Sequence, residues 1–192
     1  MKKILVLACA TATISLAGGA VHADSIKGKI GVTGKMGFQI PADNELGPYK
    51  DKTETGFIGG GGIIYGIDNN FAAEFDVTRS MFDSRFAYYG VTNVTLGAQY
   101  RFVLAHPKLV PYVGTGLDIL MIDTDQGRNV DTTVGIHASG GVDYFLMKQL
   151  ALTAEAKLVI APDTDINGPS GKVGSFDPNA FSTTFGVRYF FN

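Results

Sequence analysis

The sequence predicts an all-β fold: an eight-stranded antiparallel up-and-down transmembrane β-barrel with short periplasmic turns and longer extracellular loops. Three observations predict it. Eight segments alternate apolar and polar residues with a period of two, the period of a β-strand. Short and long connections alternate along the chain. After residue 23, no run approaches the ~20 apolar residues that a membrane-spanning helix needs, whereas strands of about 9 to 11 residues suit a closed membrane barrel.

Composition supports one folded domain. The chain has 192 residues, 45% of them hydrophobic and 18% charged, with a formal charge of -2. A disordered chain would have fewer apolar residues and more net charge, and a nucleic-acid-binding protein would normally be basic. The single cysteine, Cys9, argues against a disulfide scaffold.

Residues 1–23 resemble a secretory signal peptide. Lys2 and Lys3 precede an apolar stretch over 4–17, and 21–23 supply small residues at the two positions that a signal peptidase reads. A lipoprotein cut before Cys9 is the alternative, but it leaves too short an apolar core. We therefore expect cleavage after residue 23 and a barrel domain over 24–192, with 14 basic and 18 acidic residues and no cysteine.

The first expected strand spans 28–40, where Ile30, Val32 and Met36 alternate with Thr33 and Lys35. Seven more follow with the same period, at 55–67, 71–80, 91–102, 109–121, 132–144, 150–160 and 180–191. Short connections are expected at 68–70, 103–108 and 145–149, and long polar ones at 41–54, 81–90, 122–131 and 161–179. One end of the sheet therefore carries turns and the other carries loops.

Alternation alone does not decide which face points outward, so a soluble lipocalin-like barrel with an apolar interior is the alternative. Three features favour a membrane barrel. The polar face is rich in glycine, which suits a crowded lumen, and the last strand places aromatic residues at alternate positions. Aromatic residues also gather beside the short turns, as in an interfacial girdle: Tyr65, Phe71, Tyr100, Phe102, Tyr144, Phe145, Tyr189 and Phe191.

The last strand, 181–191, resembles the terminal signal that the outer-membrane assembly machinery of Gram-negative bacteria reads, through Phe185, Val187, Tyr189 and Phe191; Asn192 departs from the pattern. Segments 111–117 and 140–144 are similar to strands of the small outer-membrane barrel families typified by OmpW and OmpA. The resemblance implies a bacterial outer-membrane location. It also implies as partners the β-barrel assembly machinery, periplasmic chaperones, and outer-membrane lipid with lipopolysaccharide.

The OmpW resemblance implies a narrow channel for small apolar solutes, and the OmpA resemblance a structural or surface protein. A periplasmic lipocalin-like carrier and a lipid A-modifying hydrolase are the alternatives from other classes. We expect no enzyme, no cofactor and no nucleic-acid partner.

The polar faces carry five charged residues of each sign, which predicts a neutral lumen. They are Lys29, Lys35, Arg101, Lys157 and Arg188 against Glu74, Asp76, Asp118, Asp143 and Glu155. Side chains fill the bore of an eight-stranded barrel, and unpaired charges there would be costly, so we expect a salt-bridge network rather than acid–base catalysis. Five of the ten fall in the turn-side half, which predicts a charge-paired plug.

Two motifs could indicate a catalytic site or a metal site. His137 and Ser139, with Glu155 on the next strand, resemble the His-x-Ser pair of lipid A deacylases, but that pair faces lipid, and Gly140 replaces its following Asn; we favour lumenal packing. Asp163, Asp165 and Asn167 match the first half of a calcium loop. The glutamate of the twelfth position is missing, so we favour an exposed loop over a calcium site.

Overall fold

The computed structural model describes residues 26–46, 49–84, 88–104, 108–124, 129–168 and 171–191. The expected signal peptide and Asn192 lie outside these residues. Within them, no helix is long and apolar enough to cross a membrane.

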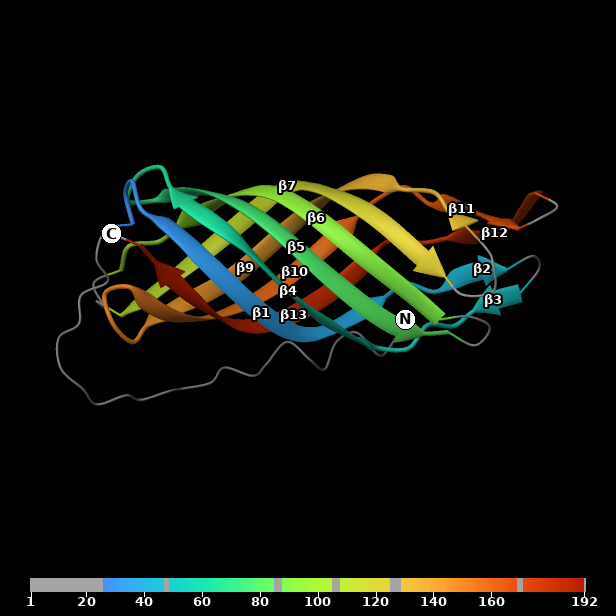
Figure 1. Cartoon of the computed structure of the whole chain (residues 1–192), viewed down its shortest axis with the longest axis horizontal. Helices are drawn as coiled ribbons and strands as arrows, with labels where there is room; N and C mark the ends of the chain where they lie inside the picture. The colour runs from blue at the N-terminus through green and yellow to red at the C-terminus, as the bar shows by residue number, and fades with distance from the viewer. Residues whose placement is uncertain are drawn as a thin grey trace.

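Eight long antiparallel strands close into a barrel in the order β1-β13-β10-β9-β7-β6-β5-β4 (Figure 1). Strand β1 closes it by pairing with β4 on one side and β13 on the other, with Gly31 opposite both Ile64 and Phe190. The strands are β1 (Ile30–Pro41), β4 (Gly56–Gly66), β5 (Phe71–Asp83), β6 (Tyr88–Arg101), β7 (Leu109–Thr124), β9 (Thr133–Phe145), β10 (Leu150–Ile160) and β13 (Ala180–Phe190).

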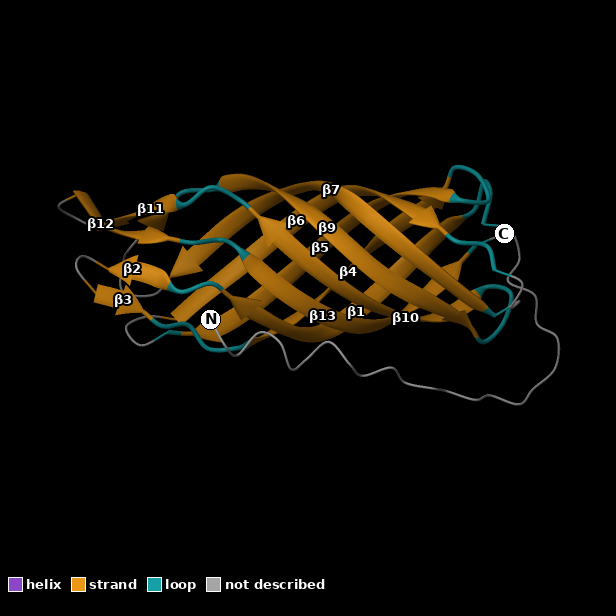
Figure 2. Cartoon of the chain, turned by 180° about the vertical axis from the view of Figure 1, so that it is seen from behind, coloured by secondary structure: helices purple, strands orange, loops and turns teal. Residues whose placement is uncertain are grey.

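The loop end carries a second sheet that the sequence did not predict (Figure 2). Its five short strands have the order β3-β2-β12-β11-β8. They are β2 (Asn44–Leu46), β3 (Tyr49–Asp51), β8 (Asn129–Val130), β11 (Thr164–Gly168) and β12 (Gly171–Phe176). We call them the cap sheet. The connection expected at 81–90 is also much shorter, because β5 continues to Asp83 and β6 starts at Tyr88.

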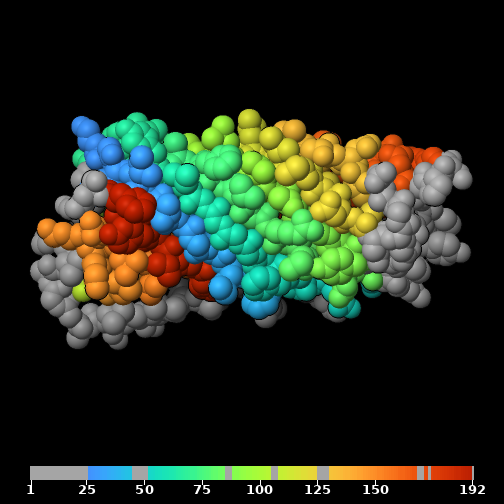
Figure 3. Space-filling model, viewed as in Figure 1, coloured from blue at the N-terminus to red at the C-terminus, as the bar shows by residue number. Residues whose placement is uncertain are grey.

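The barrel is polar inside and apolar outside. Met36 and Phe185 on the outer face are 63% and 64% exposed, whereas the neighbouring Lys35 is 8% exposed. Figure 3 shows the strands wrapping obliquely around this wall. A soluble barrel with an apolar interior has the opposite arrangement, so the fold is that of a transmembrane barrel.

Apolar side chains close the lumen at both ends. The turn-end layer consists of Ile26, Ile64, Ala72, Val110, Phe145, Ala151 and Phe190. The loop-end layer consists of Phe82, Tyr89, Val91, Leu120, Ile122, Val159 and Ala161 with Ile166 and Phe176 of the cap sheet. Between these layers the mid-lumen side chains are mostly polar, with the buried Ile58 of β4 as an apolar member.

The aromatic girdle beside the turns is formed by six of the eight expected residues, Tyr65, Phe71, Tyr100, Phe102, Tyr189 and Phe191, which are exposed on the outer face. The prediction that Phe145 belongs to the girdle is wrong, because Phe145 is buried in the turn-end layer and stacks on Phe190 with ring centroids 5.9 Å apart. The reason is strand parity, the alternation by which successive residues of a strand point to opposite faces. Tyr144 shares the outward face of β9 with Val142, so the next residue points inward.

Candidate functional site

The candidate site is the charged lumen, and its turn-side part is built around Asp143 on β9. Asp143 Oδ2 accepts a hydrogen bond from Arg101 Nη2 at 2.6 Å and another from Arg188 Nη1 at 2.9 Å. Arg188 Nη2 also bonds Glu74 Oε1 at 3.2 Å. The Arg101 and Arg188 side chains are 1% exposed and that of Asp143 is 0% exposed. Four strands are thus tied together across the bore.

Polar neighbours hold these four side chains in place. Gln99 Nε2 donates to Glu74 Oε2 at 2.6 Å, and Gln99 Oε1 accepts from Arg101 Nη1 at 3.2 Å. Arg188 Nε donates to Thr33 Oγ1 on β1 at 2.9 Å. Hydrogen bonds of this kind offset the cost of removing charges from water, which makes the network stable only as a unit.

Tyr112 on β7 connects this network to mid-lumen. The guanidinium carbons of Arg101 and Arg188 each lie 5.7 Å from the centroid of its ring, within cation–π range. Its hydroxyl donates to Glu155 Oε2 at 3.1 Å. Glu155 Oε1 in turn lies 3.3 Å from Lys35 Nζ, which also bonds Asp76.

The loop-side part of the network is built around Asp118 on β7. Asp118 Oδ1 accepts from Lys157 Nζ at 2.8 Å, from Asn93 Nδ2 at 2.7 Å and from Thr95 Oγ1 at 2.8 Å. Its other oxygen lies 2.6 Å from His137 Nδ1. Asp118, and not the Glu155 that the hydrolase alternative would require, is the carboxylate that faces the imidazole.

Nine of the ten predicted lumenal charges lie inside the barrel. Lys29 is half-buried and precedes β1 at the turn end, next to Gly28, which has a left-handed φ of 72°. The described lumen thus holds four basic and five acidic side chains, with His137 as the further group that faces an acid. His137 shares the inward face of β9 with Gly135 and Asp143, the lumenal position that the alternation predicts.

Glycines make room for this network. A Cβ at Gly141 would lie 2.4 Å from Tyr112 Cζ, and one at Gly116 would lie 2.8 Å from His137 Cε1. At these two positions of the glycine-rich polar face, glycine is therefore required by the packing of a large lumenal ring.

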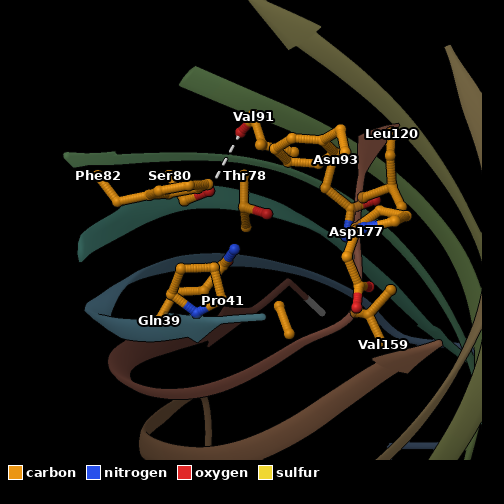
Figure 4. Close-up of a pocket in the computed structure, with 13 residues that line it drawn as sticks. Gln39, Pro41, Thr78, Ser80, Phe82, Val91, Asn93, Leu120, Val159 and Asp177 are labelled. Atoms are coloured by element: carbon orange, nitrogen blue, oxygen red, sulfur yellow. Dashed lines mark hydrogen bonds between the residues drawn. The ribbon is translucent and has the colours of Figure 1, made fainter. Parts of the chain in front are cut away.

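Two small cavities of about 20 Å³ each lie between the charged network and the loop-end layer. Figure 4 shows the outer one, whose lining includes Gln39, Thr78, Val159 and the strand neighbours Asn93 and Leu120. Asn93 Oδ1 borders both cavities and has no hydrogen-bond partner from the protein. Each cavity has room for about one water molecule, so the lumen is filled along most of its length.

The residues of the two motifs are placed as follows. His137 and Ser139 face the lumen, and the Ser139 Oγ lies 2.6 Å from where a Cβ of Gly114 would be. Asp163 precedes β11, while Asp165 and Asn167 lie within it, and Asp165 accepts from Lys172 Nζ at 2.5 Å. Across the described ranges, no three His, Cys, Asp or Glu side chains form a group that could hold a metal ion. The preference for an exposed loop over a calcium site stays a prediction.

A closed antiparallel barrel with an apolar outer wall and a polar, filled lumen defines the class of small outer-membrane barrels. The chain matches the family described as outer membrane protein beta-barrel domain over residues 8–190, and it belongs to that family. Its place is accordingly the bacterial outer membrane.

Solved structures share this fold. The chain is similar to the outer membrane protein OprG from Pseudomonas aeruginosa, with 17% identity, a TM-score of 0.71 and coverage of 90% of this chain and 98% of that one. Neisserial surface protein A is 18% identical, with a TM-score of 0.61 and coverage of 84% of this chain and 97% of that one. The E. coli outer membrane protein W is 18% identical, with a TM-score of 0.52 and coverage of 86% of this chain and 98% of that one. At these identities the likeness shows the fold alone. No curated protein sequence matches the chain.

Proposed function

We propose that this protein is a closed barrel that anchors a folded β-sheet at the outer surface of the outer membrane, and that it is not an open diffusion pore. The observation that carries the proposal is the network around Arg188. From β13 this one side chain reaches Asp143 on β9, Glu74 on β5 and Thr33 on β1, so it crosses the bore. The apolar layer at the turn end lies directly beyond it.

The orientation belongs to the same proposal. Both ends of the barrel chain and the short turns face the periplasm, and the cap sheet faces outward, as is usual for barrels of this class. The chain is exported by a cleaved leader over 1–23, escorted by periplasmic chaperones and inserted by the assembly machinery. The cap sheet lies among lipopolysaccharide molecules, where a rigid surface can contact other molecules.

Planar-bilayer recording on the refolded protein tests the closed lumen. The wild type should show little or no steady conductance, because water-sized cavities do not form a continuous path. Arg101→Ala or Arg188→Ala should raise it, since each opens the network. Arg79→Ala is the control, because Arg79 lies on the outer face and pairs with Asp123 there. A large wild-type conductance that neither lumenal variant changes would refute the proposal.

Passage of small apolar solutes is the second candidate. It is favoured by the cavity beneath the loop-end layer, whose wall includes Phe82, Val91, Leu120 and Phe176. Such a solute could enter there, but the charged network lies further along the bore. Uptake of a small alkane into vesicles with refolded protein tests this, and uptake no faster than in protein-free vesicles would exclude it.

The hydrolase alternative has less support. The His137 imidazole is 6% exposed inside the barrel, so it does not face the lipid in which lipid A lies. We therefore propose a non-enzymatic role. Lipid A mass spectra from cells with and without the protein should be identical, and a lost acyl chain in its presence would overturn this.

A further inference from the structure

The described residues of the short turns include large apolar side chains that are exposed. Val103 and Met147 are 68% and 64% exposed, as much as the most exposed apolar residues of the outer wall, Phe185 at 64% and Met36 at 63%. Ile67, Leu104 and Leu146 are exposed as well, so each of the three short turns contributes. We call these five residues the turn rim. Turns in contact with water alone would normally be polar.

Basic residues accompany the turn rim. Lys27, Lys29, Lys108 and Lys148 all lie in the turn-end segments, and Asp68 is the only acidic residue among those that the structure describes there. The backbone N–H groups of Phe71 and Asn70 each donate to Asp68 Oδ1 at 2.7 Å and hold the pKa of that carboxyl below its usual range. The described residues of the turn end thus carry a net positive charge at neutral pH.

The loop end has the opposite charge. Acidic residues outnumber basic ones in the long connections 42–55 and 161–179, and the cap-sheet cation Lys172 is paired with Asp165. The turn rim therefore differs from the other end of the barrel in the sign of its charge. Exposed apolar residues together with positive charge favour a partner that is both apolar and anionic.

We propose that the turn rim and its lysines sink into the headgroup region of the membrane and bind anionic phospholipid. Apolar side chains gain by leaving water at this depth, and lysine stems reach outward so that the ammonium meets a phosphate. Basic residues beside a membrane span are the usual recognition of anionic lipid. The barrel is then held at its turn end by lipid, with the girdle residues Tyr100 and Phe102 further into the bilayer.

The placement is consistent with the order of residues along the chain. Tyr100 ends the outward face of β6, Phe102 follows with its ring 5.0 Å from that of Tyr100, and the rim residues Val103 and Leu104 come next. The apolar surface thus continues past the girdle and into the turn. A barrel whose membrane border lay at the girdle would leave this surface in water.

Tryptophan fluorescence tests the depth. The chain contains no Trp, so Met147→Trp places a single reporter on the rim, and Glu54→Trp places one on an exposed loop-end site. In vesicles of phosphatidylcholine brominated near the headgroup, the Met147→Trp emission should be blue-shifted and strongly quenched, whereas the Glu54→Trp emission should not. Heat-modifiable gel mobility verifies that both variants are folded. Emission of the rim reporter as in water would overturn the proposal and leave the rim free for a protein partner.

Lipid selectivity tests the charge. Spin-labelled phosphatidylglycerol should be enriched over spin-labelled phosphatidylcholine at the wild-type barrel by roughly two- to fivefold in low salt. The double variant Lys27→Gln/Lys148→Gln should lose most of this preference. Lys52→Gln/Lys172→Gln removes the same charge from exposed loop-end sites and should keep it. Equal enrichment of the two lipids by the wild type, or equal losses in both double variants, would contradict the proposal. Neither result depends on whether the lumen conducts.

Discussion

Arg188 is the side chain on which most of the turn-side network depends, because it bonds partners on three other strands. Replacing it with alanine leaves Asp143 and Glu74 buried without that cation. Loss of one partner from a buried ion pair costs about 3 to 5 kcal/mol. We expect Arg188→Ala to lower the free energy of unfolding by that amount, measured by urea titration of the refolded barrel.

The control for that prediction is another arginine of the same chain. Arg79 Nη1 lies 3.0 Å from Asp123 Oδ2, but both side chains are about half exposed or more. Exposed pairs contribute about 0 to 1 kcal/mol, so Arg79→Ala should change stability little. If the two alanine variants lost equal stability, burial of the Arg188 network would not be the cause.

Strand parity could predict which residues share the lumen, and it did so for residues within regular strands. Arg101 and Asp143 both fall on the inward face by counting alone. Parity alone does not place Lys29, which lies before the first residue of β1 and beside the left-handed Gly28. It also could not predict that Asp118 faces His137, since that pairing depends on rotamers that bridge β7 and β9 across the sheet.

Strand β10 offers a test of the outer wall. Ala154 lies near its middle on the outward face, between the inward Thr153 and Glu155. An arginine there should cost about 2 to 4 kcal/mol, because it places a charge in the hydrocarbon layer. Ala154→Leu adds volume without charge and is the matched control. Refolding into lipid vesicles with urea titration measures both, and equal stabilities would mean that this face does not contact lipid.

Strand β13 offers a test of assembly. Tyr189 and Phe191 are exposed on the outer face, so the folded barrel loses little buried contact without them. We expect Tyr189→Ser/Phe191→Ser to refold in vitro but to leave unassembled protein in the periplasm of cells, seen by heat-modifiability after pulse-chase. Phe181→Ser, at the far end of the same strand, should assemble normally. Normal assembly of the double variant would show that the signal lies elsewhere.

The eight long strands could be predicted because each presents one continuous apolar face, and such a face determines its own register. The five cap strands could not. They have between two and six residues, too few for a period of two to stand out from a polar loop. The end of β5 could not be predicted for a similar reason. Met81 and Phe82 are both apolar, so the alternation of apolar and polar residues is interrupted before the strand ends at Asp83.

At the scale of the whole molecule, the lumen consists of layers stacked along the barrel axis. An apolar layer closes the turn end, the charged network fills the middle, and a second apolar layer joins the barrel to the cap sheet. The sequence could predict a charge-paired interior, but not its apolar ends. Ile166 and Phe176 complete the loop-end layer from a segment expected to be an irregular loop.

In this arrangement the cap sheet is attached to the barrel through the side chains of Ile166 and Phe176. Phe176 is 1% exposed, and its ring centroid lies 5.3 Å from that of Tyr89 on β6. Phe176→Ala should lower the free energy of local unfolding of the cap by about 3 to 5 kcal/mol, the usual cost of a large-to-small change in a core. The eight wall strands keep their pairing, so heat-modifiability should persist while protease cleavage of 161–179 becomes faster. Lys172→Ala on the same hairpin removes only a surface ion pair and should leave cleavage unchanged. Cleavage of Phe176→Ala at the wild-type rate would mean that the cap is held by its own strand pairing and not by the barrel beneath it.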